Sequence, residues 1–134
     1  MEKKYYGRVS KQLSAIIENE DGLRLQVVAV DTAGNGVSIL CNIYQREAIT
    51  PEGRIIRNGK PVELSIALDL PDEDGRTSSI VARCHVAYSR RISNEQCMIG
   101  MRYVDFEHSN HERLLRFISE TRVHNDGLRT LVCA

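Results

Sequence analysis

The sequence predicts one mainly β domain, an antiparallel barrel or sandwich of six or seven strands followed by a single α-helix. A chain of 134 residues with 42% hydrophobic and 27% charged residues has the size and composition of one globular domain with one core. Strand-like segments follow one another, separated by turns, and no helix alternates with them, which disfavours a parallel α/β sheet. An antiparallel barrel or sandwich is therefore favoured, and closure into a barrel would also remove exposed strand edges.

Six segments have the apolar, alternating or β-branched pattern of strands: residues 12–18, 23–30, 37–43, 61–68, 78–89 and 97–106. The first two are expected to form a β-hairpin because residues 19–22, Asn-Glu-Asp-Gly, have turn chemistry. Residues 31–36 carry two glycines, and residues 71–75 combine proline, acidic residues and glycine, so both stretches are predicted as turns. Residues 45–60 are predicted as a connecting loop with a short strand at residues 54–56.

One helix is predicted at residues 109–123. Ser109 and Glu112 have the spacing of a capping box, in which each side chain accepts a hydrogen bond from a backbone N–H of the other residue. Four apolar residues then share one face: Leu114, Leu115, Phe117 and Ile118. The predicted organisation is a flexible basic arm at residues 1–11, a barrel with this helix at residues 12–124, and a tail at residues 125–134 that begins with a turn.

Several functional classes are disfavoured by the composition. The apolar runs are far shorter than the about 20 residues of a membrane span, and no hydrophobic export signal follows Met1, which predicts a cytoplasmic protein without membrane insertion. Eighteen basic residues balance 18 acidic ones, so binding to a nucleic-acid polymer is not expected. No Gly-rich phosphate loop, nucleophile elbow or zinc-protease motif is present, so no enzyme activity is expected. The four cysteines form no C-x-x-C pair, so free thiols are expected rather than a metal site.

Basic residues are concentrated in the N-terminal arm. Residues 1–11 hold four Lys or Arg against one acidic residue, in a chain that is neutral overall. The glycine-bearing turn at residues 31–36 follows about twenty residues later. Two interpretations are open: a local anion-binding site, or a solvated basic terminus.

Two short motifs lie at these places. Lys4-Tyr5-Tyr6-Gly7-Arg8 reads K-x-x-x-R, and the six residues from Asp31 to Gly36 read D-x-A-x-x-G. Their order resembles the PilZ domain, a bacterial family of receptors for cyclic di-GMP, in which the motifs are R-x-x-x-R and [D/N]-x-S-x-x-G. Residues 98–106, Met-Ile-Gly-Met-Arg-Tyr-Val-Asp-Phe, are similar to the penultimate strand of that family, and the predicted helix follows them as it does in PilZ domains.

The resemblance implies a PilZ-type barrel that binds cyclic di-GMP on its exterior through seven residues: Lys4, Arg8, Asp31, Ala33, Gly36, Tyr88 and Arg90. A guanidinium such as that of Arg8 can fork onto guanine O6 and N7 or onto a phosphate. Asp31 would accept hydrogen bonds from the guanine N1–H and amine, and Gly36 would allow a positive φ or close approach of the ligand. Tyr88 and Arg90 match places where some PilZ proteins set an aromatic and a basic residue against a guanine.

Two positions depart from the family pattern. Lys4 keeps the positive charge of the first motif arginine but lacks its planar fork, and Ala33 lacks the motif hydroxyl. Two functions are therefore carried forward. The first is a receptor whose ligand orders the N-terminal arm and which acts, through an unidentified effector protein, in second-messenger control of motility or biofilm formation. The second is a degenerate PilZ-type domain that does not bind cyclic di-GMP and serves as a protein–protein adaptor. Neither function needs a cofactor.

Overall fold

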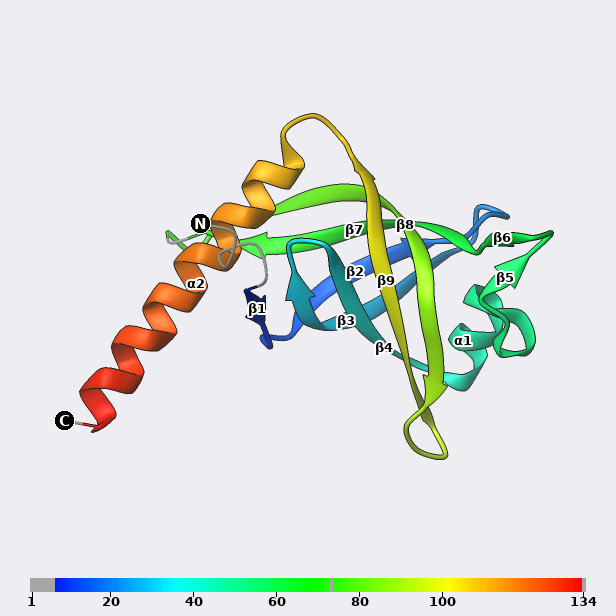
Figure 1. Cartoon of the computed structure of the whole chain (residues 1–134), viewed down its shortest axis with the longest axis horizontal. Coiled ribbons are helices and arrows are strands. Elements are labelled where there is room, and N and C mark those ends of the chain that lie inside the picture. The colour runs from blue at the N-terminus through cyan, green and yellow to red at the C-terminus, as the bar shows by residue number, and fades with distance from the viewer. Residues whose placement is uncertain (1–6, 73, 134) are drawn as a thin grey trace.

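The computed structural model describes residues 7–72 and 74–133, with side chains as far as residue 121. The elements are shown in Figure 1 and are, in chain order, β1 (Arg8–Val9), β2 (Leu13–Glu18), β3 (Arg24–Ala33), β4 (Gly36–Asn42), α1 (Ile43–Ile49), the 3-10 turn η2 (Pro51–Gly53), β5 (Ile56–Arg57), β6 (Lys60–Pro61), β7 (Glu63–Pro71), β8 (Thr77–Arg91), β9 (Gln96–Phe106) and α2 (Asn110–Cys133).

The main sheet has seven strands in the order β1-β3-β2-β7-β8-β9-β4, and all of its pairings are antiparallel. A further antiparallel pairing between β3 and β4 closes six of these strands into a barrel. Strand β1 pairs with β3 only and adds the seventh strand outside the closed ring. The predicted antiparallel barrel with a C-terminal helix is confirmed.

The core fills the interior of the barrel because every strand presents alternate residues to it. Strand β7 is the clearest example, since four residues at every second position have at most 1% of their surface exposed: Leu64, Ile66, Leu68 and Leu70. Facing strands contribute Ile17, Ile39 and Ile99, each fully buried. Burial of such a side chain is worth about 1.5–3 kcal/mol relative to exposure, so this alternation is the main source of stability.

Three β-bulges interrupt the alternation, and two of them, in β3 and in β8 near its C-terminal end, determine which residues face outward on one side of the barrel. Val30 is the extra residue of β3, between Ala29 paired with Ile39 and Asp31 paired with Ser38. Ala87 is the extra residue of β8, between Val86 paired with Met101 and Tyr88 paired with Gly100. One inserted residue moves every following side chain to the opposite face of the sheet.

The consequence for β8 is visible in its burial pattern. Ile80, Ala82, Cys84 and Val86 are buried, and strict alternation would place Tyr88 in the core as well. After the bulge Tyr88 instead lies outside, with 37% of its surface exposed. In β3 the same device buries Thr32 and turns Asp31 outward beside Ser38.

Helix α2 begins at Asn110 and covers one end of the barrel through three buried residues, Leu114, Phe117 and Ile118. Its first turns are also held by polar contacts. Arg113 forms an ion pair with Asp72 and donates to Ser78 Oγ at 2.9 Å. The Nε2 of His111 lies 3.2 Å from the carbonyl oxygen of Gly34, and the His111 ring stacks on Phe106 with 4.6 Å between centroids.

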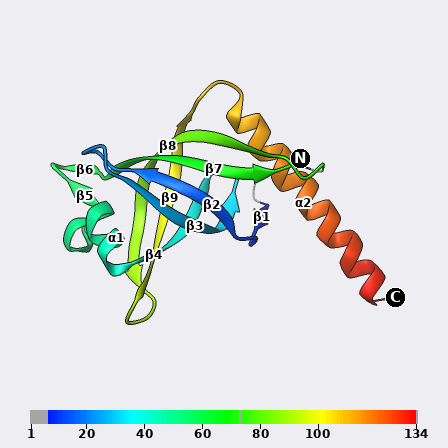
Figure 2. The same cartoon turned by 180° about the vertical axis from the view of Figure 1, so that it is seen from behind.

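The structure differs from three local predictions. The helix does not end near residue 123 but continues to Cys133, so most of the expected tail at residues 125–134 is helical and extends away from the barrel (Figures 1 and 2). A single glycine costs a helix only about 1 kcal/mol, which is not enough to end it. In the expected arm at residues 1–11, Arg8–Val9 form β1 and Val9 is buried, whereas residues 1–6 lie outside the described part.

The third difference is the expected loop at residues 45–60, which contains the last five residues of α1, then η2 and the hairpin of β5 and β6. Asn42 and Gln45 cap α1 reciprocally: Asn42 Oδ1 accepts from the Gln45 backbone N–H at 2.8 Å, and Gln45 Oε1 accepts from the Asn42 backbone N–H at 3.0 Å. Asn-x-x-Gln is itself a capping-box signal, so this helix was detectable in the sequence. Among the described helices, none is long and apolar enough to cross a membrane.

Candidate ligand-binding site

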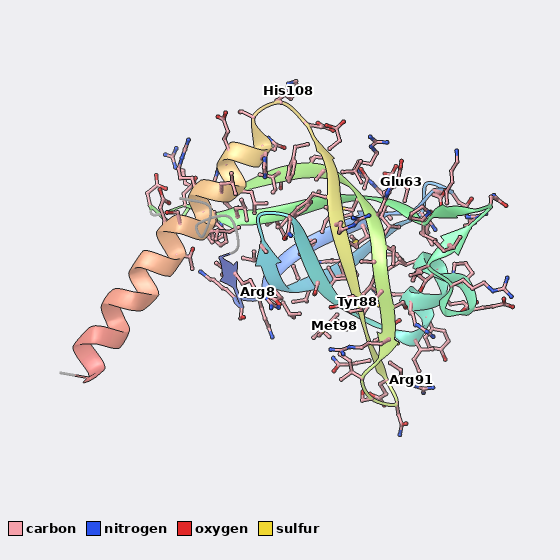
Figure 3. The ribbon with its side chains drawn as sticks, viewed as in Figure 1. Arg8, Glu63, Tyr88, Arg91, Met98 and His108 are labelled. Atoms are coloured by element: carbon pink, nitrogen blue, oxygen red, sulfur yellow. The ribbon has the colours of Figure 1, made fainter. Side chains whose placement is uncertain are left out.

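An open cavity of about 330 Å³ lies on the outer surface of the barrel, where β1, β3, β4, β8 and β9 meet. Five of the seven predicted site residues line it: Arg8, Asp31, Ala33, Gly36 and Tyr88. Arg90 lies next to it, and Lys4 lies outside the described residues. In Figure 3, Arg8 and Tyr88 are seen on the same side of the barrel.

The floor of the cavity is one row of outward-facing residues across four strands. Asp31 of β3 pairs with Ser38 of β4, Ser38 pairs with Gly100 of β9, and Gly100 pairs with Tyr88 of β8. Both bulges are needed for this row, because they turn Asp31 and Tyr88 to the same outer face.

A second row lies two residues further along the strands. Arg8 of β1 pairs with Ala33 of β3, and Gly36 of β4 pairs with Arg102 of β9. On the other side of the floor, Met98 of β9 pairs with both Leu40 and Arg90. Arg90 is therefore one outward row away from Tyr88. Met98 and Tyr88, on the adjacent strands β9 and β8, are both labelled in Figure 3.

Arg8 and Asp31, the last residue of one motif and the first of the other, are joined by an ion pair. Arg8 Nε donates to Asp31 Oδ1 at 3.2 Å, and Arg8 Nη2 contacts Asp31 Oδ2. The arginine side chain is 67% exposed and the carboxylate 20% exposed, so the guanidinium faces solvent while the carboxylate is sheltered. A bidentate pair of this kind fixes both groups in orientation at the rim of the cavity.

Tyr88 forms a flat aromatic surface in the cavity. A Cβ built on Gly100 would lie only 2.0 Å from Tyr88 Cε2, so the ring lies directly against the glycine backbone. Its hydroxyl forms a 2.9 Å hydrogen bond with Ser38 Oγ, and the Arg90 guanidinium carbon lies 5.6 Å from the ring centroid. Gly100 and Ser38 thus hold one face of the ring down, and an aromatic ring held in this way can stack on a nucleobase.

Two reasons were expected for a glycine at position 36: a positive φ or close approach of the ligand. Gly36 does not have a positive φ; in the described chain the glycines that do are Gly22, Gly53, Gly59 and Gly75. Its Cβ would lie 2.5 Å from the carbonyl oxygen of Met101. The close approach is therefore that of strand β9, and any larger residue would push β4 and β9 apart beside the cavity.

Sequence inspection missed seven residues that line the cavity: Asn35, Val37, Ser38, Ala87, Gly100, Met101 and Arg102. Gly100 and Arg102 stand in the family-like segment at residues 98–106, and their i, i+2 spacing puts both on one face of a strand. Which face is outward, and which strand lies opposite, depends on long-range register that local patterns do not reveal.

Three cysteine side chains belong to the buried core of the barrel. Cys41, Cys84 and Cys97 are buried and free, and no group of three or more metal-binding side chains occurs among the described residues. Burial raises the pKa of Cys84 to about 12, and burial together with the neighbouring Cys97 raises the pKa of Cys41 to about 11. Both thiols therefore stay protonated at neutral pH and behave as small hydrophobic groups.

Comparison with solved structures identifies proteins with a similar fold. No protein-family model and no curated protein sequence matches the chain. Among solved structures, the inhibitor of motility MotI/DgrA of Bacillus subtilis is similar, with a TM-score of 0.66 and 16% identity over 89% of this chain and 50% of that one. PlzA of Borreliella burgdorferi, solved in complex with c-di-GMP, has a TM-score of 0.52 and 9% identity over 92% of this chain and 55% of that one.

The PilZ domain of CeSA from a cellulose-synthesizing bacterium also matches, with a TM-score of 0.48 and 15% identity over 86% of this chain and 97% of that domain. The chain spans about half the length of MotI/DgrA and of PlzA. The overall fold is therefore similar to those of MotI/DgrA and PlzA, and the chain has a PilZ-type fold.

Proposed function

We propose that the protein is a receptor for cyclic di-GMP, with the ligand bound on the barrel exterior in the cavity between Arg8 and Tyr88. The proposal is supported mainly by the position of the predicted residues, which come from separate strands and lie together. Five residues singled out from the sequence, four from the two motifs on β1, β3 and β4 and Tyr88 from β8, meet in one cavity of about 330 Å³. That volume is within the range of small-molecule sites, and such sites combine an apolar surface with a few polar groups.

Each lining group suits one part of a guanine dinucleotide. The Tyr88 ring, held flat on Gly100, offers a stacking surface for a base. The sheltered Asp31 carboxylate accepts hydrogen bonds from the guanine N1–H and amine, and the exposed Arg8 guanidinium binds a phosphate or the O6/N7 edge. Arg90, 5.6 Å from the Tyr88 ring, adds positive charge at the rim.

Binding would change the Arg8–Asp31 ion pair, which occupies both groups without ligand. A phosphate competes with Asp31 for the Arg8 guanidinium and so pulls on β1, a strand of two residues. We propose that the ligand orders the N-terminal arm, including Lys4, by this route. The PlzA structure, with its bound c-di-GMP, supports the choice of ligand.

The role proposed is binding and signalling, not catalysis. The receptor would act in the bacterial cytoplasm through an effector protein, and motility or biofilm formation is the proposed process. The similar fold of a protein described as an inhibitor of motility supports that choice.

One observation favours a second candidate, an adaptor that docks to a protein without cyclic di-GMP. Ala33 puts no hydroxyl into the cavity, and the Arg8 guanidinium is already satisfied by Asp31. A ligand must therefore replace an existing ion pair with fewer motif groups than an intact site provides.

Isothermal titration with cyclic di-GMP, cyclic di-AMP and GTP at physiological salt separates the two functions. We expect selective micromolar binding of cyclic di-GMP, at least tenfold weaker in Arg8→Ala and in Asp31→Asn because each removes a charged hydrogen bond. Urea unfolding of both variants serves as the folding control. Absence of heat up to about a millimolar ligand would sink the receptor proposal and leave the adaptor, to be pursued by isolating a protein partner.

A further inference from the structure

The cavity contains a second guanidinium that neither sequence motif includes. Arg102 of β9 lines the cavity, is exposed, and pairs in register with Gly36, the last residue of the D-x-A-x-x-G motif. It stands two residues beyond Gly100 on the outward face of β9, about 6.6 Å from the backbone on which the Tyr88 ring lies. An arginine side chain spans that distance, so its head can reach the edge of a base stacked on Tyr88.

Arg102 also differs from Arg8 in charge balance. The guanidinium of Arg8 is paired with Asp31, whereas Arg102 makes no ion pair with another residue in the described part of the chain. The charged lining groups of the cavity are Arg8, Asp31 and Arg102, so the uncompensated positive charge belongs to Arg102. A ligand that contacts it has no ion pair to break.

We propose that Arg102 supplies the guanidinium fork that Lys4 lacks and reads the O6/N7 edge of the guanine stacked on Tyr88. This inference rests on the proposed function. It explains how the site keeps two arginine forks, from Arg8 and Arg102, although the first motif carries only one. A lysine at position 4 then needs to supply charge alone, which it does as well as arginine.

The test is titration of cyclic di-GMP into Arg102→Ala and Arg102→Lys, with Arg24→Ala as the matched control. Arg24 is another exposed arginine on a barrel strand, but it lies seven residues from Asp31 along β3, about 23 Å away. We expect Arg102→Ala to weaken binding about ten- to a hundredfold and Arg24→Ala to leave it within about twofold of the wild type. Arg102→Lys should lose most of the affinity that Arg102→Ala loses, because lysine keeps the charge and not the fork.

Three results would overturn the inference while leaving the receptor function intact. These are wild-type affinity in Arg102→Ala, wild-type affinity in Arg102→Lys, and an equal loss in Arg24→Ala. Failure of the wild-type protein itself to bind cyclic di-GMP is a different outcome, since it would remove the proposed function on which the inference rests. Urea unfolding of each variant checks that a loss of affinity is not a loss of fold.

Discussion

Substitution of Gly100 by alanine tests whether the Tyr88 ring is the stacking surface of the site. The added Cβ would lie 2.0 Å from Tyr88 Cε2 and 2.4 Å from Cζ. Non-bonded carbons normally approach to about 3.5–4.0 Å, so the ring must move by about 1.5–2 Å. Tyr88 is 37% exposed and can swing toward solvent, and its hydrogen bond to Ser38 Oγ is lost when it does so.

The expected changes in stability and in affinity differ in size. Loss of the Tyr88–Ser38 hydrogen bond costs about 0.5–1.5 kcal/mol, and alanine in place of glycine inside a strand returns about 0.5–1 kcal/mol. The free energy of unfolding should therefore change by no more than about 1 kcal/mol. A base stacked on an aromatic ring contributes about 1–3 kcal/mol, so the affinity for cyclic di-GMP should fall about five- to a hundredfold.

A double-mutant cycle with Tyr88→Ala tests whether Gly100 affects binding through the Tyr88 ring. Isothermal titration gives the affinities of both single variants and of the double variant, and urea unfolding gives their stabilities. If Gly100 acts by placing the ring, Gly100→Ala has no further effect on binding once Tyr88 is alanine. Additive losses in the double variant, or wild-type affinity in Gly100→Ala, would refute the reasoning.

Two further predictions concern stability. Arg113→Ala removes the ion pair to Asp72 and the hydrogen bond to Ser78. Urea unfolding followed by circular dichroism should therefore show a free energy of unfolding lower by about 1–2 kcal/mol. An unchanged midpoint and slope of the unfolding curve would contradict the role of Arg113 in holding α2. Burial raises the pKa of Cys84 from 9.0 to about 12. Above pH 9 the thiol therefore loses its proton in the unfolded chain but keeps it in the folded one. The free energy of unfolding then falls as the pH rises, by up to about 1.4 kcal/mol per pH unit. Cys84→Ala should reduce that slope in urea unfolding between pH 8 and 10.5, and equal slopes in the two proteins would show that Cys84 is not the group responsible.

The elements that could be predicted are those specified by local chemistry. The alternation of residues 61–68, the turn at residues 19–22 and the apolar stripe of residues 114–118 each belong to one segment, and each is found in the structure. Helix α1 was missed although Asn42 and Gln45 carry a capping signal, because its segment is short and flanked by loop-forming residues.

The candidate site could be predicted only in part, because its residues come together through register between distant strands. The motif residues Arg8 and Asp31 were found from their order along the chain. The bulges at Val30 and Ala87 leave no local signal, yet they decide that Asp31 and Tyr88 face outward. Arg102 is adjacent to Gly36 only through the β4–β9 pairing, which no pattern within either strand specifies.

Helix α2 continues well beyond the residues that pack against the barrel. Its 24 residues span about 36 Å, and the part beyond Ile118 accounts for about 22 Å of that length. The short end rests on the β3–β4 loop, where His111 meets the carbonyl of Gly34 inside the second motif. A rigid rod tilted by about 5° at its base moves its far end by about 2 Å over that length. A small shift of the motif loop that tilted the helix would therefore move its far end more than its base, far from the cavity itself.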